Sequence, residues 1–302
     1  MLDNVLSLLH RSTEILQMWF SVICQWCKEG VPLSDWFNSG VAWFTEHLTW
    51  LTQPISSGME WCLAVLKDGL LLIPAPVLIV LAAALALWRC GKLIAVFAIV
   101  GLLMVWNQNL WESLVYSLSL VLISTLLSII IALPLGMLAA LFRPVELVTK
   151  PILDLMQTMP AFVYLLPCVA LFGIGVMPAV LATVIFAMPP AVRFTILGIQ
   201  QVPSDLDEGA EAFGSTRAQK LFKLQLPIAR PTIMAGINQT VMLALSMSVI
   251  ASMVGAEGLG ADVYSAIQSN DNGHGIVSGI CVVVLAVLLD RIAQSFKGKD
   301  YV

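Results

Sequence analysis

Residues 114–142 read LVYSLSLVLISTLLSIIIALPLGMLAALF and contain no charged side chain. A helix that crosses the ~30 Å hydrocarbon core of a bilayer needs about 20 mostly apolar residues. This uncharged stretch is longer than that requirement, and no polar face divides it. It therefore predicts a membrane-spanning helix. A helix that is surrounded by lipid indicates that the chain is a membrane protein.

The composition of the whole chain agrees with this assignment. Of its 302 residues 59% are hydrophobic and only 11% are charged, whereas a soluble domain carries roughly 25% charged residues. With so few charges, most of the outer surface must face lipid. We therefore expect an all-α polytopic membrane protein with about seven transmembrane helices, at residues 70–88, 93–106, 114–142, 152–174, 177–199, 232–254 and 276–296. Prolines 160, 167, 189 and 190 are expected to break the helical hydrogen bonding.

The distribution of Lys and Arg predicts the orientation of these helices. Basic residues follow the first, third, fifth and seventh expected helices, whereas the loops at 107–113, 173–177 and 255–275 contain none. Cytoplasmic loops carry the excess of Lys and Arg. We therefore expect the N-terminus outside, the C-terminus in the cytoplasm, and the loop at 200–231 on the cytoplasmic side.

Residues 1–69 differ from the rest because they hold six of the nine tryptophans without being apolar enough to span. Apolar residues between 33 and 51 recur at helical spacing, which predicts one apolar stripe. We expect amphipathic helices here, including one over residues 5–26, that lie along the bilayer interface; an additional helical layer packed on the protein is the alternative. Cys24 and Cys27 form a CxxC, but no second pair or nearby His completes a metal site, which favours a structural role.

Charged groups are absent from the middle of every expected span, which argues against coupling to an ion gradient. The charged residues nearest the membrane are all close to cytoplasmic helix ends: Asp154, Arg193, Asp290 and Arg291. The chain has no GxxxxGK[ST] phosphate loop and no recognisable catalytic set, and the glycine-rich GAEGLG at 255–260 is expected outside. We therefore expect no catalysis, cofactor, metal or nucleic acid for this chain, and an energy source in another subunit.

The cytoplasmic insert LDEGAEAFGSTRAQKLFKLQLPIARP, residues 206–231, is unusually polar for this chain. Acidic residues at its start favour a helix that Gly214 can end. Ser215 or Thr216 can cap a second helical piece, which Pro227 is expected to stop. Physical arguments alone leave two alternatives open: a helical knob that docks a partner, or a solvated loop with no further role.

The insert resembles the cytoplasmic loop of ATP-binding-cassette (ABC) importer permeases, whose pattern is E-A-A, three residues, G, nine residues, then I-x-L-P. The register matches throughout and departs only at Gly209, where Ala is usual, and at Leu224, where Ile is common. The resemblance implies that these residues couple to an ATPase: Glu208, Gly209, Ala210, Gly214, Leu224, Leu226 and Pro227. Gly209 is expected to cost that helical turn up to ~1 kcal/mol.

Five longer segments resemble the glycine betaine/proline subfamily of these permeases: 71–88, 157–167, 186–199, 202–216 and 247–267. The resemblance implies the type I ABC importer permease fold, with a five-helix core at 113–297 that contains the coupling loop 200–231, accessory helices at 70–112 and interfacial helices at 1–69. It also implies a bacterial cytoplasmic (inner) membrane location and import of glycine betaine, proline betaine, choline, carnitine or proline. No binding domain is expected at the end of the chain.

The same resemblance implies the partners and the route of the solute. The partners would be a second permease copy, two cytoplasmic ATPases that bind ATP and Mg, an extracytoplasmic solute-binding protein and the bilayer. Candidate path residues are Thr158, Pro160, Phe162, Tyr164, Phe186, Pro189 and Pro190. Three of them are aromatic and could attract a quaternary ammonium, although ordinary helix packing is the better explanation for any single one of them. The alternative functions are an ion-coupled secondary transporter and a non-transporting scaffold that recruits a cytoplasmic partner.

Overall fold

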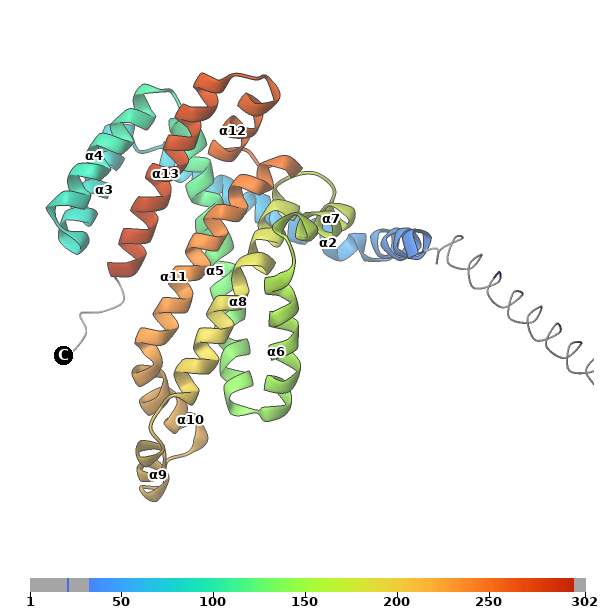
Figure 1. Cartoon of the computed structure of the whole chain (residues 1–302), viewed down its shortest axis with the longest axis vertical. Helices are drawn as coiled ribbons and strands as arrows, with labels where there is room; N and C mark the ends of the chain where they lie inside the picture. Colours follow the sequence, from blue (N-terminus) through green and yellow to red (C-terminus); the bar gives the residue numbers. More distant parts are fainter. Residues whose placement is uncertain (1–20, 22–32, 296–302) are drawn as a thin grey trace, which may run out of the picture. The chain divides into compact units, whose positions relative to one another are not determined.

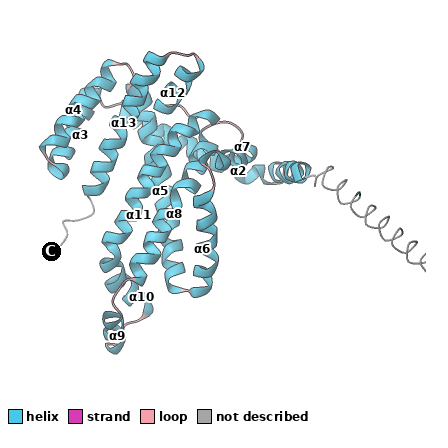
Figure 2. Ribbon diagram, viewed as in Figure 1, coloured by secondary structure: helices cyan, strands magenta, loops and turns pink. Residues whose placement is uncertain are grey.

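The computed structural model describes residue 21 and residues 33–295. Helices joined by short loops make up this part of the chain, and it contains no strand (Figure 2). In chain order the helices are α2 (Leu33–Leu71), α3 (Ala75–Cys90), α4 (Lys92–Asn107), α5 (Trp111–Leu141), α6 (Arg143–Thr158), α7 (Ala161–Phe172), α8 (Val176–Gln200), α9 (Ser204–Ala212), α10 (Arg217–Lys220), the π-helix η1 (Leu221–Gln225), α11 (Leu226–Ala251), the 3-10 helix η2 (Ser252–Val254), α12 (Leu259–Gln268) and α13 (Asn272–Gln294).

The chain divides into two units between Trp50 and Leu51. In the first unit, residues 33–50 form the first part of α2, so the expected helix at 33–51 is confirmed. Its Trp36, Trp43 and Trp50 are 64%, 59% and 71% exposed, which suits a helix at a lipid interface. That location stays a prediction. The helix expected over 5–26, with Cys24 and Cys27, lies outside the described residues apart from Ser21.

Helices α5, α8 and α11 lie side by side at the centre of the second unit (Figure 1). Small residues allow their backbones to approach closely, as is usual between transmembrane helices. A Cβ atom added at Gly136 of α5 would lie 2.6 Å from the Cβ of Thr195, and one at Gly236 of α11 would lie 2.6 Å from the Cβ of Phe194. The three helices therefore form a core that is close-packed by backbone contact.

Within the described residues, four helical stretches are long and apolar enough to cross a membrane: Trp111–Leu141, Val176–Gln200, Arg217–Val254 and Asn272–Gln294. They correspond to the expected helices at 114–142, 177–199, 232–254 and 276–296. The number rises to six if each of two bent helix pairs is one span. The expected helix at 93–106 forms as α4, but its 16 residues give a length of only ~24 Å. The described residues thus provide four to six candidate spans, compared with the seven or so expected.

Two of the expected spans are bent pairs of helices, and the break expected at Pro160 is confirmed. The expected helix at 152–174 consists of α6 and α7, which meet at 103°. Met159 before Pro160 has an extended ψ of 134°, because a proline disfavours the helical conformation of the residue before it. The expected helix at 70–88 likewise begins in the end of α2 and bends by 95° before α3, at the sequence that includes Pro74.

Three other prolines do not break their helices, contrary to expectation. Helix α7 continues through Pro167, and α8 continues through Pro189 and Pro190. Pro189 and Pro190 are buried, and the carbonyl oxygen of Pro190 lies only 3.0 Å from the Cβ position of Gly236 on α11. Neighbouring helices commonly hold a proline-containing transmembrane helix together, and the packing of α11 against α8 provides that support here.

The insert at 206–231 and the glycine-rich loop at 255–260 lie at opposite ends of this bundle (Figure 1). At the end that carries α12, the amide of Leu259 donates to Ser117 Oγ over 2.9 Å. Gly258 has φ +102°, and a Cβ there would lie 2.4 Å from the same oxygen. The glycines of GAEGLG thus permit a tight turn against the start of α5, which accounts for this sequence without a bound nucleotide.

Candidate functional site

Helix α9 ends as the sequence predicts, at Gly214. The amide of Gly214 donates to Glu211 O over 2.9 Å and the amide of Ser215 donates to Ala210 O over 3.0 Å. These two bonds form a Schellman motif, which requires a left-handed residue after the helix. Gly214 has φ +76°, a conformation that only glycine adopts without strain. The turn therefore fixes the angle at which the chain leaves α9.

The second helical piece begins with a capping box at Thr216, one of the two predicted caps. Thr216 Oγ1 accepts from the amide of Gln219 over 3.3 Å, and the amide of Thr216 donates to Gln219 Oε1 over 2.9 Å. The two bonds satisfy donors that would be unpaired at a helix start. The capping box therefore stabilises the start of this helical piece, directly after the Gly214 turn.

Pro227 does not stop the second piece, and the expectation that it would is wrong. Helical structure runs without interruption from Arg217 to Val254. Between α10 and α11 it widens into the π-helix η1, in which the amide of Leu226 donates to Leu221 O, five residues back. In a regular α-helix the proline ring would clash with the carbonyl four residues earlier. We attribute the tolerance of Pro227 to the wider turn just before it.

The seven predicted coupling residues are distributed over these elements. Glu208, Gly209 and Ala210 lie in α9, Gly214 lies in the turn, Leu224 lies in η1, and Leu226 and Pro227 begin α11. Leu226 packs against the buried apolar cluster of Ile199, Leu221, Ala229 and Ile233. The motif thus consists of an exposed helix followed by an anchor at the start of a spanning helix.

The exposed surface of the insert includes an aromatic side chain that the sequence analysis did not select. Helix α9 has no buried residue, and Phe213 directly after it is 93% exposed. Phe222 of η1 is 62% exposed. Large exposed aromatic side chains commonly anchor protein interfaces. Phe213 was identifiable in principle, because it is the only aromatic residue between 202 and 216.

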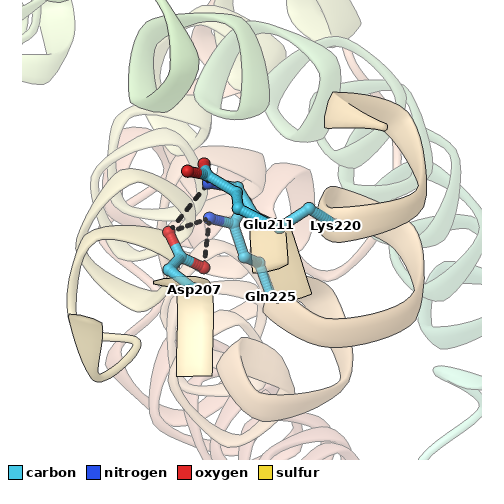
Figure 3. Close-up of polar contacts among 4 residues, drawn as sticks. All are labelled: Asp207, Glu211, Lys220 and Gln225. Carbon is cyan, nitrogen blue, oxygen red and sulfur yellow. Dashed lines mark hydrogen bonds and ion pairs between the residues drawn. The ribbon is translucent and has the colours of Figure 1, made fainter. Parts of the chain in front are cut away.

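A polar cluster connects α9 to η1 (Figure 3). Gln225 Nε2 donates to both carboxylate oxygens of Asp207, over 3.1 and 3.0 Å. Lys220 Nζ lies 3.2 Å from Asp207 Oδ2 and 2.7 Å from Glu211 Oε1. The sequence analysis did not predict these contacts, because contacts across 18 residues depend on how the chain turns at Gly214.

The candidate path residues occupy two different environments. Tyr164 of α7 is buried, donates its hydroxyl to Met156 O and meets the ring of Phe186 of α8 edge to face at 5.8 Å. Phe162, in contrast, is 53% exposed, and Thr158 and Pro160 lie at the exposed bend before it. The structure therefore brings Tyr164 and Phe186 together in a packing contact and leaves Phe162 accessible.

The charged residues near the helix ends pair with each other or with neighbouring amides. Arg193 of α8 forms an ion pair with Asp154 of α6, and the side chain of Gln200 donates to Glu146 Oε1 over 2.9 Å. Asp290 accepts from Gln294 within its own helix over 2.7 Å. Among the described residues, no group of three or more His, Cys, Asp or Glu could hold a metal ion. These charges therefore tie α6 to α8 and form a side-chain contact within the last turns of α13.

A bundle of apolar helices with an exposed helical insert at one end is the architecture of a membrane permease that docks a separate subunit. The family model described as "Binding-protein-dependent transport system inner membrane component" matches residues 132–298. The chain therefore belongs to this family, and it is an ABC importer permease of the type I fold.

Curated relatives extend this similarity over most of the chain. It is 49% identical over 269 residues to the glycine betaine transport system permease protein OpuAB of Bacillus subtilis, covering 89% of this chain and 95% of that protein. It is 47% identical over 279 residues to the glycine betaine/carnitine transport permease protein GbuB of Listeria monocytogenes, covering 89% and 96%. It is 44% identical over 281 residues to the glycine betaine/proline betaine transport system permease protein ProW of Escherichia coli, covering 93% and 79%.

A solved structure supports the same fold. The inward-facing MetNI methionine ABC transporter has a chain that matches with a TM-score of 0.57 at 22% identity, covering 64% of this chain and 96% of that one. The expected resemblance to permeases of the glycine betaine/proline group, made from five short segments, is confirmed by the relatives above.

Proposed function

We propose that this permease forms the membrane path of an ATP-driven importer for quaternary ammonium solutes, with glycine betaine as the first substrate to test and proline betaine, choline, carnitine and proline next. The observation that carries this proposal is the 44–49% identity to three permeases whose names all include glycine betaine. That identity covers about nine-tenths of this chain, including the insert and the bent helices α6 and α7.

In this proposal two cytoplasmic ATPase subunits bind ATP and Mg, and the permease itself binds neither. Each ATPase would receive α9 in a groove, with Phe213 as the apolar anchor and Glu208 on the exposed face. Burying a phenyl ring that is 93% exposed contributes roughly 1.5–3 kcal/mol, enough to account for a large part of a docking contact. ATP-driven closure of the ATPases would then move the spanning helices through this contact.

The remaining partners are a second copy of this chain and an extracytoplasmic solute-binding protein. Residues 113–297 would form the translocation core with α3 and α4 as accessory helices, and residues 1–69 would lie along the interface. The exposed Phe162 is the best placed of the candidate path residues for contact with a cation. Tyr164 and Phe186 would hold α7 against α8 beside it, together with the bend at Thr158 and Pro160 and the prolines Pro189 and Pro190.

Uptake of radiolabelled solute into proteoliposomes tests this function. The reconstituted complex should accumulate glycine betaine only with ATP inside and binding protein outside. Phe213→Ala should reduce co-purification of the ATPase about tenfold, whereas Phe222→Ala serves as the matched aromatic control. Uptake that continues without ATP hydrolysis and stops when an ion gradient is dissipated would instead identify an ion-coupled carrier. Retention of an ATPase without uptake of any of the five solutes would contradict the substrate class.

A further inference from the structure

Helix α9 has few contacts that could fix its orientation. None of its residues is buried, so apolar burial, which orients most helices in proteins, cannot hold it. Among the described residues, the side chains of α9 form hydrogen bonds and ion pairs with other elements only in the cluster shown in Figure 3. The orientation of α9 therefore depends on the Gly214 turn and on this cluster.

Asp207 is the centre of the cluster. Its carboxylate accepts from Gln225 Nε2 over 3.1 and 3.0 Å and lies 3.2 Å from Lys220 Nζ. Asp207 and Lys220 are only 28% and 16% exposed, and Gln225 is 6% exposed. Charge-assisted hydrogen bonds that are partly withdrawn from water are stronger and more directional than exposed ones. The cluster is therefore suited to hold a geometry.

The position of Gln225 connects this geometry to the membrane. Gln225 is the last residue of η1 and directly precedes α11, which continues into the spanning region. One turn earlier, Leu221 anchors the same helix in the apolar cluster with Ile199 and Ala229. If Asp207 moves, its hydrogen bonds therefore transmit the movement to Gln225 and so to the start of α11. This route does not involve the turn at Gly214.

We propose that Asp207, Lys220 and Gln225 are positioning residues that make α9 and the start of α11 move as one body. In their absence α9 would still bind its partner but would pivot at Gly214 when the partner moves. This inference rests on the proposed function, because it requires an ATPase that docks at α9.

A substitution at Gln225 can separate a positioning role from an effect on protein stability, because of the environment of its side-chain carbonyl. Its Oε1 is buried without a hydrogen-bond partner among the described residues, and an unpaired buried acceptor is itself destabilising. Gln225→Leu removes this acceptor together with the bonds to Asp207. The variant should therefore fold as well as the natural chain while it releases α9.

The experiment compares solute uptake per ATP hydrolysed in proteoliposomes that contain the complete complex. Asp207→Asn, Lys220→Met and Gln225→Leu should each lower this ratio about fivefold or more, with co-purification of the ATPase retained. Asp205→Asn and Lys223→Met make the same chemical changes at exposed positions outside the cluster and should leave the ratio within about twofold. Lys220→Arg keeps the charge and the donors and should preserve coupling.

Hydrogen exchange of the assembled complex supplies an independent readout. Amides of residues 204–212 should exchange about tenfold faster in the three cluster variants than in the two controls. Unchanged exchange with an unchanged uptake ratio would overturn the inference. Loss of the ATPase from the cluster variants would also overturn it, because the residues would then serve docking. Failure of the natural chain to retain an ATPase would instead overturn the proposed function on which the inference depends.

Discussion

Two glycines of the insert have opposite structural roles, although they are only five positions apart. Gly214 has φ +76° and closes the Schellman motif after α9. Gly209 lies within α9, and a Cβ added there would meet no atom within 4 Å. Gly214 is therefore required by its backbone conformation, whereas Gly209 only weakens the helix in which it lies.

Replacing each glycine by alanine should consequently have opposite effects on α9. Gly214→Ala should cost about 1 kcal/mol through left-handed strain, and weaken ATPase binding about fivefold. Gly209→Ala should slow amide exchange across residues 204–212, because alanine gains up to ~1 kcal/mol of helix propensity. Hydrogen exchange and quantitative co-purification measure both effects. Equal effects of the two substitutions would contradict the distinct roles assigned to these glycines.

At the residue scale, local signals were predictable and contacts across the loop were not. Gly214 and Thr216 were identified from sequence because a helix end and a helix cap depend on neighbours within a few residues. The bonds of Gln225 to Asp207 depend on the angle of the Gly214 turn and on the π-helix, which no periodic pattern specifies. Phe213 could have been selected as the only aromatic residue between 202 and 216, but its exposure became evident only in the structure.

Among the helices, the tightest glycine contact between α8 and α11 is at Gly236. A Cβ at Gly236 would lie 2.6 Å from the Cβ of Phe194 and 3.0 Å from the carbonyl oxygen of Pro190. Both atoms are close to the backbone of α8, so neither can rotate away. Gly236→Ala should therefore destabilise the protein by about 2 kcal/mol, and lower its thermal midpoint in detergent by about 5 °C.

Gly279 of α13 provides the control for this substitution, because a Cβ there would meet no atom within 4 Å. Gly279→Ala should leave the thermal midpoint unchanged or slightly raised, since alanine is the better helix former. A midpoint for Gly236→Ala equal to that of Gly279→Ala would show that α8 and α11 are less closely packed than the structure indicates.

The presence of the long helices was predictable, because a long apolar stretch in a membrane protein has few alternatives to a spanning helix. The effects of the prolines were predictable only in part. Pro160 breaks its segment, whereas Pro189 and Pro190 do not. The chemistry of the residue is the same at these positions. Pro189 and Pro190 are buried within α8, where neighbouring helices support the chain, whereas Pro160 is exposed at a bend. Pro167 is also exposed and yet lies within α7, so exposure alone does not identify a bend.

In the second unit as a whole, the insert and the loop before α12 lie at opposite ends of the helices (Figure 1). The end with α9 and α10 carries Arg217, Lys220 and Lys223, and the loop at 255–275 carries acidic residues and no Lys or Arg. The separation in space makes the charge asymmetry meaningful, because the two loops cannot share one side of a bilayer that the helices between them cross. The positive-inside rule then predicts the insert on the cytoplasmic side.

Cysteine labelling in intact cells measures this orientation directly. In a background without native cysteines, Ser204→Cys places a thiol at the exposed start of α9, and Ser269→Cys places one at the exposed end of α12. A membrane-impermeant maleimide should label position 269 in intact cells, and position 204 only after the membrane is permeabilised, because basic residues hold the insert inside. Labelling of position 204 in intact cells would show that the orientation is the opposite of the one predicted. An ATPase fuelled by cytoplasmic ATP could then not reach α9, so this single measurement also tests the physical basis of coupling.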